Sequence, residues 1–182
     1  MLTELQKKKL PNLFNLHDLD KNGVIEQADF EQFTQMVCGN QGIEIGSSEY
    51  TTLNERYMAL WSGLSAMADT NQDNQVTLTE WYSFCDTMLS TEGMYEQVST
   101  PLAGLIFDLV DHDNDGRISL DEYIAFVQTT GTEEAVATDV FSRLDHNQDG
   151  YLSTDEILMR LEEFFRSDDP AAPGNWFFGS FE

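Results

Sequence analysis

The sequence is poor in basic residues. Its 182 residues include 9 Lys and Arg against 33 Asp and Glu, which gives a formal net charge of −24. This scarcity argues against nucleic acid and anionic membrane surfaces as partners, because contacts to phosphate groups need Lys and Arg. Like charges in such excess also oppose compaction unless counter-ions bind. The positions of the acidic residues should therefore show where cations could sit.

Cysteine and long apolar runs are also scarce. Cys38 and Cys85 are the two cysteines, and they form neither a CxxC motif nor a disulfide framework. We expect two buried free thiols in a reducing compartment. No apolar run approaches the roughly 18 residues that span a membrane, and the first residues resemble neither a secretion signal nor a myristoylation signal. The sequence thus predicts a cytoplasmic protein without a membrane anchor.

Hydrophobic residues are abundant nevertheless, at 41% of the chain with 12% aromatic, which favours a globular protein over a disordered acidic one.

Four 12-residue repeats contain many of the acidic residues. Each starts with Asp, carries Asp or Asn at its third and fifth positions, and has a carboxylate at its twelfth position. The repeats are DLDKNGVIEQAD (loop 1, 18–29), DTNQDNQVTLTE (loop 2, 69–80), DHDNDGRISLDE (loop 3, 111–122) and DHNQDGYLSTDE (loop 4, 145–156).

This pattern is that of the EF-hand calcium loop. Calcium takes about six to eight oxygen ligands, and a short loop supplies them from positions 1, 3, 5, 7 (backbone carbonyl), 9 (directly or through water) and 12. Applied to the four repeats, these positions predict the following metal ligands: Asp18, Asp20, Asn22, Val24, Glu26 and Asp29; Asp69, Asn71, Asp73, Gln75, Thr77 and Glu80; Asp111, Asp113, Asp115, Arg117, Ser119 and Glu122; Asp145, Asn147, Asp149, Tyr151, Ser153 and Glu156.

The four loops differ in completeness. Loop 3 lacks nothing, and loop 4 replaces one Asp by Asn147, which still offers an oxygen. Loop 2 has Asn74 where the pattern has Gly, but Asn tolerates the left-handed conformation better than most residues. Loop 1 ends in Asp29, one methylene shorter than Glu, which favours six-coordination and hence competition by Mg²⁺. We expect up to four Ca²⁺ ions, with a mixed Ca²⁺/Mg²⁺ site in loop 1.

Amphipathic segments flank the loops and predict helices. Apolar residues within 50–67 indicate a helix of about 20 residues before loop 2. Thr100 and Pro101 suggest a helix start before loop 3, and Pro11 a kink or a helix start before loop 1. Position 8 of each loop should pair with the same position of a neighbouring loop in a short β bridge, which couples loop 1 with loop 2 and loop 3 with loop 4.

The predicted fold is all-α, with four EF-hands in two paired lobes that form one compact globule. The N-terminal pair covers residues 1–92 and the C-terminal pair residues 93–166. The tail 167–182 carries four aromatic residues within its last seven and should pack between the lobes. No histidine pair has zinc-ligand spacing, so we expect the histidines (His17, His112 and His146) to be solvated. No phosphate loop or nucleophile motif is present, and we expect no enzyme activity.

The chain resembles a known family in three features. The loops start at residues 18, 69, 111 and 145, so that the intervals shorten from 51 to 42 to 34 residues. Together with Asp29 closing loop 1, the stretch LWSGLSAMADTNQDNQVTLTEW and the tail DPAAPGNWFFG, this spacing is similar to the invertebrate sarcoplasmic calcium-binding proteins, especially the calexcitin type, and to bacterial calerythrin. The resemblance implies a compact all-α protein that buffers calcium. In that family the second and fourth loops are often degraded, whereas loop 4 is intact here.

Three functions follow as alternatives. The leading one is a cytosolic calcium buffer, most simply a monomer, with metal ions as its partners. The second is a calcium sensor whose aromatic tail or apolar groove engages a target protein. The third is a small-ligand carrier, since coelenterazine-binding proteins and photoproteins share the fold that the resemblance implies.

Overall fold

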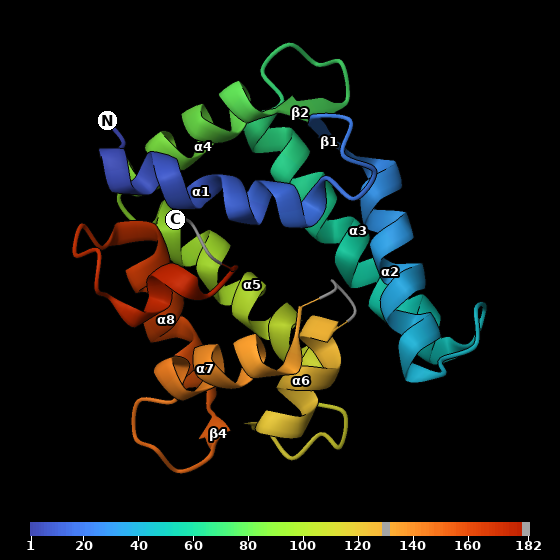
Figure 1. The fold of residues 1–182 in the computed structure, drawn as a ribbon. Coiled ribbons are helices and arrows are strands. Elements are labelled where there is room, and N and C mark those ends of the chain that lie inside the picture. The colour runs from blue at the N-terminus through green and yellow to red at the C-terminus, as the bar shows by residue number, and fades with distance from the viewer. Residues whose placement is uncertain (129–131, 180–182) are drawn as a thin grey trace. The chain divides into compact units, whose positions relative to one another are not determined.

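The computed structural model describes residues 1–128 and 132–179, and within these ranges eight α-helices and four short strands follow one another (Figure 1). Each pair of helices brackets one of the acidic repeats, as the amphipathic pattern predicts. The elements are α1 (Glu4–His17), β1 (Val24–Glu26), α2 (Gln27–Gln41), α3 (Ser48–Ala68), β2 (Gln75–Thr77), α4 (Leu78–Ser90), α5 (Met94–Val110), β3 (Ile118–Ser119), α6 (Leu120–Gln128), α7 (Glu134–Leu144), β4 (Tyr151–Leu152), α8 (Thr154–Arg166) and the 3₁₀ helix η1 (Pro173–Trp176).

The strands pair as the repeats predict. β1 lies antiparallel to β2 with Ile25 opposite Val76, and β3 lies antiparallel to β4 with Ile118 opposite Leu152. These position-8 side chains are at most 1% exposed. Each bridge thus ties two loops together while it buries the apolar residue that both loops carry at the same position.

The chain divides into two compact units, Met1–Tyr95 and the segment that starts at Glu96 and includes the described tail. Aromatic side chains dominate the core of the first unit. Phe30 stacks on His17 with ring centroids 5.0 Å apart, and Tyr57 stacks on Phe33 at 5.0 Å. Trp81 donates a hydrogen bond from its indole nitrogen to the carbonyl of Leu10 at 3.1 Å, which joins α4 to α1.

His17 differs from the expectation of a solvated side chain. Its ring is buried within this aromatic cluster, and burial lowers its pKa to about 4. The residue is the last of α1 and lies on the helix face that packs inward, so it acts as a neutral core residue. His112 and His146 are exposed, as expected.

Two proline residues lie inside helices, so the helix start expected at Thr100 and Pro101 is wrong, as is the start that was one of two alternatives at Pro11; the kink, the other alternative at Pro11, stays a prediction. α1 begins at Glu4, capped by the Thr3 side chain, and continues through Pro11. α5 begins at Met94, seven residues before Pro101. A proline removes one backbone donor and disfavours the helix locally. In α5, burial of Tyr95 and Ser99 ahead of the proline supports the earlier turns.

Other expectations are confirmed. α3 has 21 residues and starts at the Ser47 cap, in agreement with the predicted long helix. Cys38 and Cys85 are free and buried, and burial raises the pKa of both thiols. Among the described helices, none is both long and apolar enough to cross a membrane.

The tail folds back within the second unit. η1 packs against α8 and α7, and the rings of Phe178 and Phe164 meet edge to face at 4.8 Å. Phe181, the last of the four predicted anchors, lies outside the described residues. Packing of the tail between the two lobes stays a prediction.

Candidate metal centres

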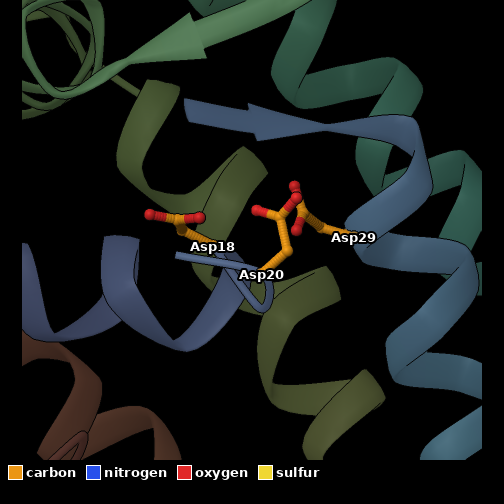
Figure 2. A group of neighbouring side chains, drawn as sticks. All are labelled: Asp18, Asp20 and Asp29. Atoms are coloured by element: carbon orange, nitrogen blue, oxygen red, sulfur yellow. The ribbon is translucent and has the colours of Figure 1, made fainter. Parts of the chain in front are cut away.

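Loop 1 brings three carboxylates together. One oxygen from each of Asp18, Asp20 and Asp29 lies within 4.8 Å of the others, and Figure 2 shows the side chains converging from the end of α1, the loop and the start of α2. Asp18 and Asp29 are each only 3% exposed. Buried like charges at this separation are unfavourable unless a cation joins them.

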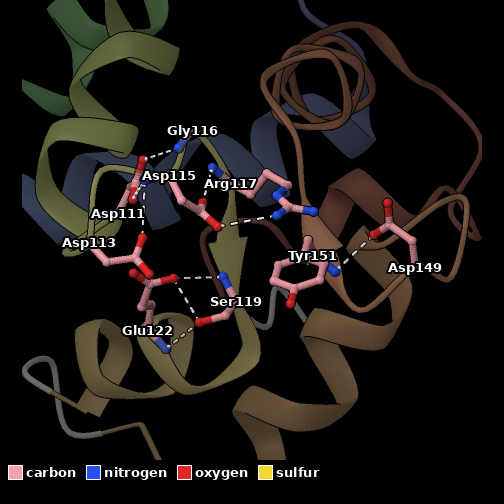
Figure 3. Close-up of polar contacts among 9 residues, drawn as sticks. All are labelled: Asp111, Asp113, Asp115, Gly116, Arg117, Ser119, Glu122, Asp149 and Tyr151. Carbon is pink, nitrogen blue, oxygen red and sulfur yellow. Dashed lines mark hydrogen bonds and ion pairs between the residues drawn. The ribbon is translucent and has the colours of Figure 1, made fainter.

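Loop 3 forms a similar but more exposed cluster. Oxygens of Asp111, Asp113 and Asp115 lie within 4.8 Å of one another. Figure 3 shows Glu122 facing them from the first turn of α6. The donor set contains only oxygen atoms from carboxylates, a hydroxyl and backbone carbonyls, which suits hard cations such as Ca²⁺ and Mg²⁺.

Loops 2 and 4 hold fewer carboxylates in the same arrangement. In loop 4 the amide group of Asn147 donates to Asp149 at 3.1 Å, and in loop 2 the amide group of Asn71 donates to Asp73 at 2.9 Å. The first Asp of each loop accepts the backbone N–H of the sixth residue, from Asn74 to Asp69 and from Gly150 to Asp145, both at 2.9 Å.

The carboxylate at position 12 has a second role as a helix cap. Thr77 caps α4 through its side chain, and Glu80 reaches back to the backbone N–H of Thr77 at 3.0 Å. Ser153 and Glu156 repeat this capping box at the start of α8. A capping box satisfies free N–H groups at the helix start, so the geometry that starts each outgoing helix also places its position-12 carboxylate beside the loop.

These hydrogen bonds change the pKa values of the position-12 carboxylates. Hydrogen bonds from Thr77 and Thr70 lower the pKa of Glu80 to about 2. Burial opposes ionisation of Glu122 and Glu156, but backbone and hydroxyl donors together outweigh it and lower the pKa of each. Asp29 behaves differently, because burial outweighs its backbone hydrogen bonds and raises its pKa. Position 12 of loop 1 thus holds protons more tightly than its counterparts.

The backbone of each loop turns through left-handed residues. Position 6 has a positive φ in every loop, including Asn74 at 63°. Asn74 thus adopts the conformation expected of it. Position 4 also has a positive φ in every loop, of 57–63° at Lys21, Gln72, Asn114 and Gln148, which the ligand pattern did not predict. Three of these four residues are Asn or Gln, a weak signal that is visible only when all four repeats are compared.

Position 7 also contributes side-chain contacts, which the ligand pattern did not predict because it assigns only the backbone carbonyl to that position. Arg117 pairs with Asp115 at 3.4 Å, and its guanidinium lies 4.3 Å from the ring centroid of Tyr151 in the opposite loop (Figure 3). In the first pair, Gln75 donates to Glu26 across the bridge at 3.0 Å. These contacts depend on the β register.

Family models match the same regions. A model described as "EF hand" matches residues 104–127 and 138–159, which contain loops 3 and 4, and one described as "EF-hand domain pair" matches residues 1–36, which contain loop 1.

Curated relatives agree with these matches. Calerythrin of Saccharopolyspora erythraea is 28% identical over 143 residues, which cover 78% of this chain and 81% of calerythrin. The sarcoplasmic calcium-binding protein of Scylla paramamosain is 30% identical over 114 residues, which cover 59% of this chain and 58% of the relative.

Solved structures share the fold. The sarcoplasmic calcium-binding protein from amphioxus superposes with a TM-score of 0.77 at 19% identity and covers 99% of both chains. The coelenterazine-binding protein from Renilla muelleri gives a TM-score of 0.76 at 22% identity, over 98% of this chain and 99% of the other. At these identities the likeness concerns the fold alone. Taken with the four loops, the family models and the curated relatives, this likeness shows that the chain is built of EF-hands and is similar to calerythrin and the sarcoplasmic calcium-binding proteins.

Proposed function

We propose that this protein is a cytosolic calcium buffer that holds Ca²⁺ in four loops and exchanges Ca²⁺ for Mg²⁺ in the first. The observation that carries the proposal is the packing of the aromatic tail on helices of its own unit. A sensor exposes an apolar groove when calcium binds, whereas here the Phe178 ring already rests on Phe164 at 4.8 Å.

Loop preorganisation supports the same function. In all four loops the position-12 carboxylate accepts N–H groups from positions 2 and 9, for example Asp29 from Leu19 at 3.0 Å and from Glu26 at 2.9 Å. A loop already folded around its site loses less conformational entropy on binding. Buffer sites of this class reach dissociation constants of about 10⁻⁸ M, whereas sensor sites lie near 10⁻⁶ M.

The proposed binding of both Ca²⁺ and Mg²⁺ in loop 1 rests on Asp29. Its short carboxylate joins the Asp18 and Asp20 cluster while both of its oxygens hold backbone N–H groups. A compact set of three carboxylates, of which Asp18 and Asp29 are buried, suits the small octahedral shell of Mg²⁺, so Mg²⁺ should compete with Ca²⁺ there.

Calorimetric Ca²⁺ titration with and without millimolar Mg²⁺ tests the proposal. A buffer should show high-affinity sites, one of which weakens strongly when Mg²⁺ is present. If every site binds only at micromolar Ca²⁺ or weaker, or if none responds to Mg²⁺, the proposed function is wrong.

A calcium sensor is the second candidate, favoured by the partial exposure of Trp176, Phe177 and Phe178. Binding of an apolar fluorescent dye separates the two functions. A buffer should bind the dye equally with and without Ca²⁺ in the folded state, and a sensor should bind much more of it when Ca²⁺ is added. The third alternative, a coelenterazine carrier, would require added coelenterazine to bind the purified protein.

A further inference from the structure

The described tail, residues 167–179, contacts the helices that flank loop 4. The backbone N–H of Gly174 donates to the Glu163 carboxylate in α8 at 2.7 Å. The Trp176 ring lies under the guanidinium of Arg143 in α7, 5.0 Å from ring centroid to Cζ. The tail therefore touches both helices that loop 4 connects.

The approach of the tail to α8 is close enough to require glycine. A Cβ atom on Gly174 would lie 2.3 Å from the carbonyl oxygen of Arg160 and 2.6 Å from Cβ of Glu163. Neither atom belongs to a flexible side-chain end, so a larger residue would displace the tail. The next residue, Asn175, is fully buried and donates to the Asp169 carbonyl at 2.8 Å.

Glu163 connects this contact to loop 4. It accepts two hydrogen bonds from Arg160, at 2.9 and 3.0 Å, and the Arg160 residue is only 4% exposed. Through its Nε atom Arg160 donates to the carbonyl of Leu144 at 3.0 Å. Leu144 is the last residue of α7 and directly precedes Asp145, the first predicted ligand of loop 4.

The contact of Trp176 with Arg143 also leads to the end of α7, next to the start of loop 4. Arg143 is the neighbour of Leu144 in the last turn of α7, so both connections from the tail end beside Asp145. The other end of loop 4 is Glu156, in the first turn of α8. The tail thus restrains the two helix ends that must meet when an ion binds.

We propose that the docked tail positions loop 4 and raises its affinity for calcium, and that calcium in loop 4 in turn strengthens docking of the tail. The inference rests on the proposed function, in which loop 4 binds Ca²⁺. Fixing α7 against α8 before the ion arrives reduces the conformational entropy lost on binding, and coupling between two sites acts equally in both directions. We expect an effect of about tenfold on affinity, the usual size of such couplings.

Selective ¹⁵N labelling of glycine in the full chain provides the test. Gly23, Gly116 and Gly150 donate to the first Asp of loops 1, 3 and 4, so each amide resonance reports on its own loop. The amide of Gly174 reports on the tail. During a Ca²⁺ titration, Gly174 should shift with the midpoint of Gly150 and differ from those of Gly116 and Gly23.

Substitutions make the test selective. Glu163→Gln weakens the tail contact, and Glu162→Gln is the matched control, because it removes the same charge from the exposed face of α8, where Glu162 pairs with Arg166. Arg143→Met removes the second connection and leaves the buried Arg160 with its partners. Glu163→Gln and Arg143→Met should each weaken Ca²⁺ binding at Gly150 severalfold and leave Gly116 unchanged, whereas the control should change neither.

The outcomes separate the two proposals. If Gly150 does not respond to Ca²⁺, loop 4 is not a calcium site, and both the proposed occupancy and this inference are wrong. If Gly150 responds but Gly174 does not follow it, the inference alone is wrong. Equal weakening at Gly116 and Gly150 would mean that the tail only stabilises the fold, which also contradicts the inference.

Discussion

Single residues distinguish four loops of the same design. At position 12, burial raises the pKa of Asp29, whereas hydrogen bonds lower the pKa of Glu80 to about 2. A carboxyl group with a raised pKa keeps its proton to a higher pH, so protons compete with metal more strongly in loop 1. As pH falls, we expect loop 1 to release its ion at a higher pH than loop 2, which a metal titration at several pH values would measure.

Restoring the methylene group at position 12 should change metal preference. Asp29→Glu allows both carboxylate oxygens to reach the ion, which favours Ca²⁺, so the effect of Mg²⁺ on the first site in calorimetry should diminish. The reciprocal control is Glu156→Asp, which should introduce Mg²⁺ sensitivity in loop 4. No change of preference in either variant would contradict the role assigned to carboxylate length.

Arg117 should weaken Ca²⁺ binding in loop 3, the loop to which it belongs. Its guanidinium holds the Asp115 carboxylate at 3.4 Å, and a bound ion must compete for that carboxylate. Because the pair is half exposed, Arg117→Gln should strengthen Ca²⁺ binding in loop 3 only about threefold, as measured by titration of the Gly116 amide. Lys21→Gln is the matched control, since Lys21 bonds the carbonyl of Asn15, which is not a predicted ligand. Weaker binding in Arg117→Gln would contradict the prediction.

At the scale of elements, the short strands and the capping boxes explain why the loops form pairs. Ile25 and Val76 are buried opposite each other, as are Ile118 and Leu152. Each outgoing helix then begins at position 10 of its loop, directly after the position-9 residue, and Thr77 and Ser153 at position 9 cap α4 and α8. Pairing and capping therefore shape each site before any ion binds.

Docking of the tail should be disrupted by one methyl group added at Gly174. Gly174→Ala places Cβ against the backbone of α8 and should undock η1, with a lower melting temperature and greater exposure of Trp176 to a fluorescence quencher. Gly104→Ala in α5 of the same unit meets no atom within 4 Å and should stabilise the protein by about 1 kcal/mol, because Ala favours helix more than Gly does. A melting temperature unchanged by Gly174→Ala would contradict the docked arrangement of the tail.

At the scale of the whole molecule, the excess of negative charge links ion binding to stability. The formal net charge of −24 would fall to −16 with four divalent ions bound. Removal of metal leaves the carboxylates of each loop unscreened, which links ion binding to folding.

Chelation should therefore lower the melting temperature strongly. Mg²⁺ should restore part of the loss and Ca²⁺ most of it, while NaCl should restore only a small part, because salt screens exposed charges better than the buried Asp18 and Asp29. Circular dichroism melts would measure the series. Equal recovery with NaCl and with Ca²⁺ would show that general screening accounts for the stability.

The sequence by itself determined the loops and their pairing. Ligand spacing and the position-8 residues are local patterns, and a short loop around an ion has few solutions, so the β register and the left-handed Asn74 were predictable. It also indicated the amphipathic helices. The helix start expected at Pro101, and the one offered as an alternative at Pro11, were wrong, because local proline chemistry does not reveal how much burial supports a turn.

Only the tertiary structure decided which side chains meet across elements. His17 lies at helical spacing from Leu10, Leu13 and Phe14 and so shares their face of α1, but only the packing of α1 on its neighbours shows that its ring is buried in the aromatic core. Arg117 reaches Tyr151 only after the strands pair. The contact of Gly174 with Glu163 joins residues on separate elements. Such contacts depend on the orientation of packed helices, and that orientation is a property of the assembled core.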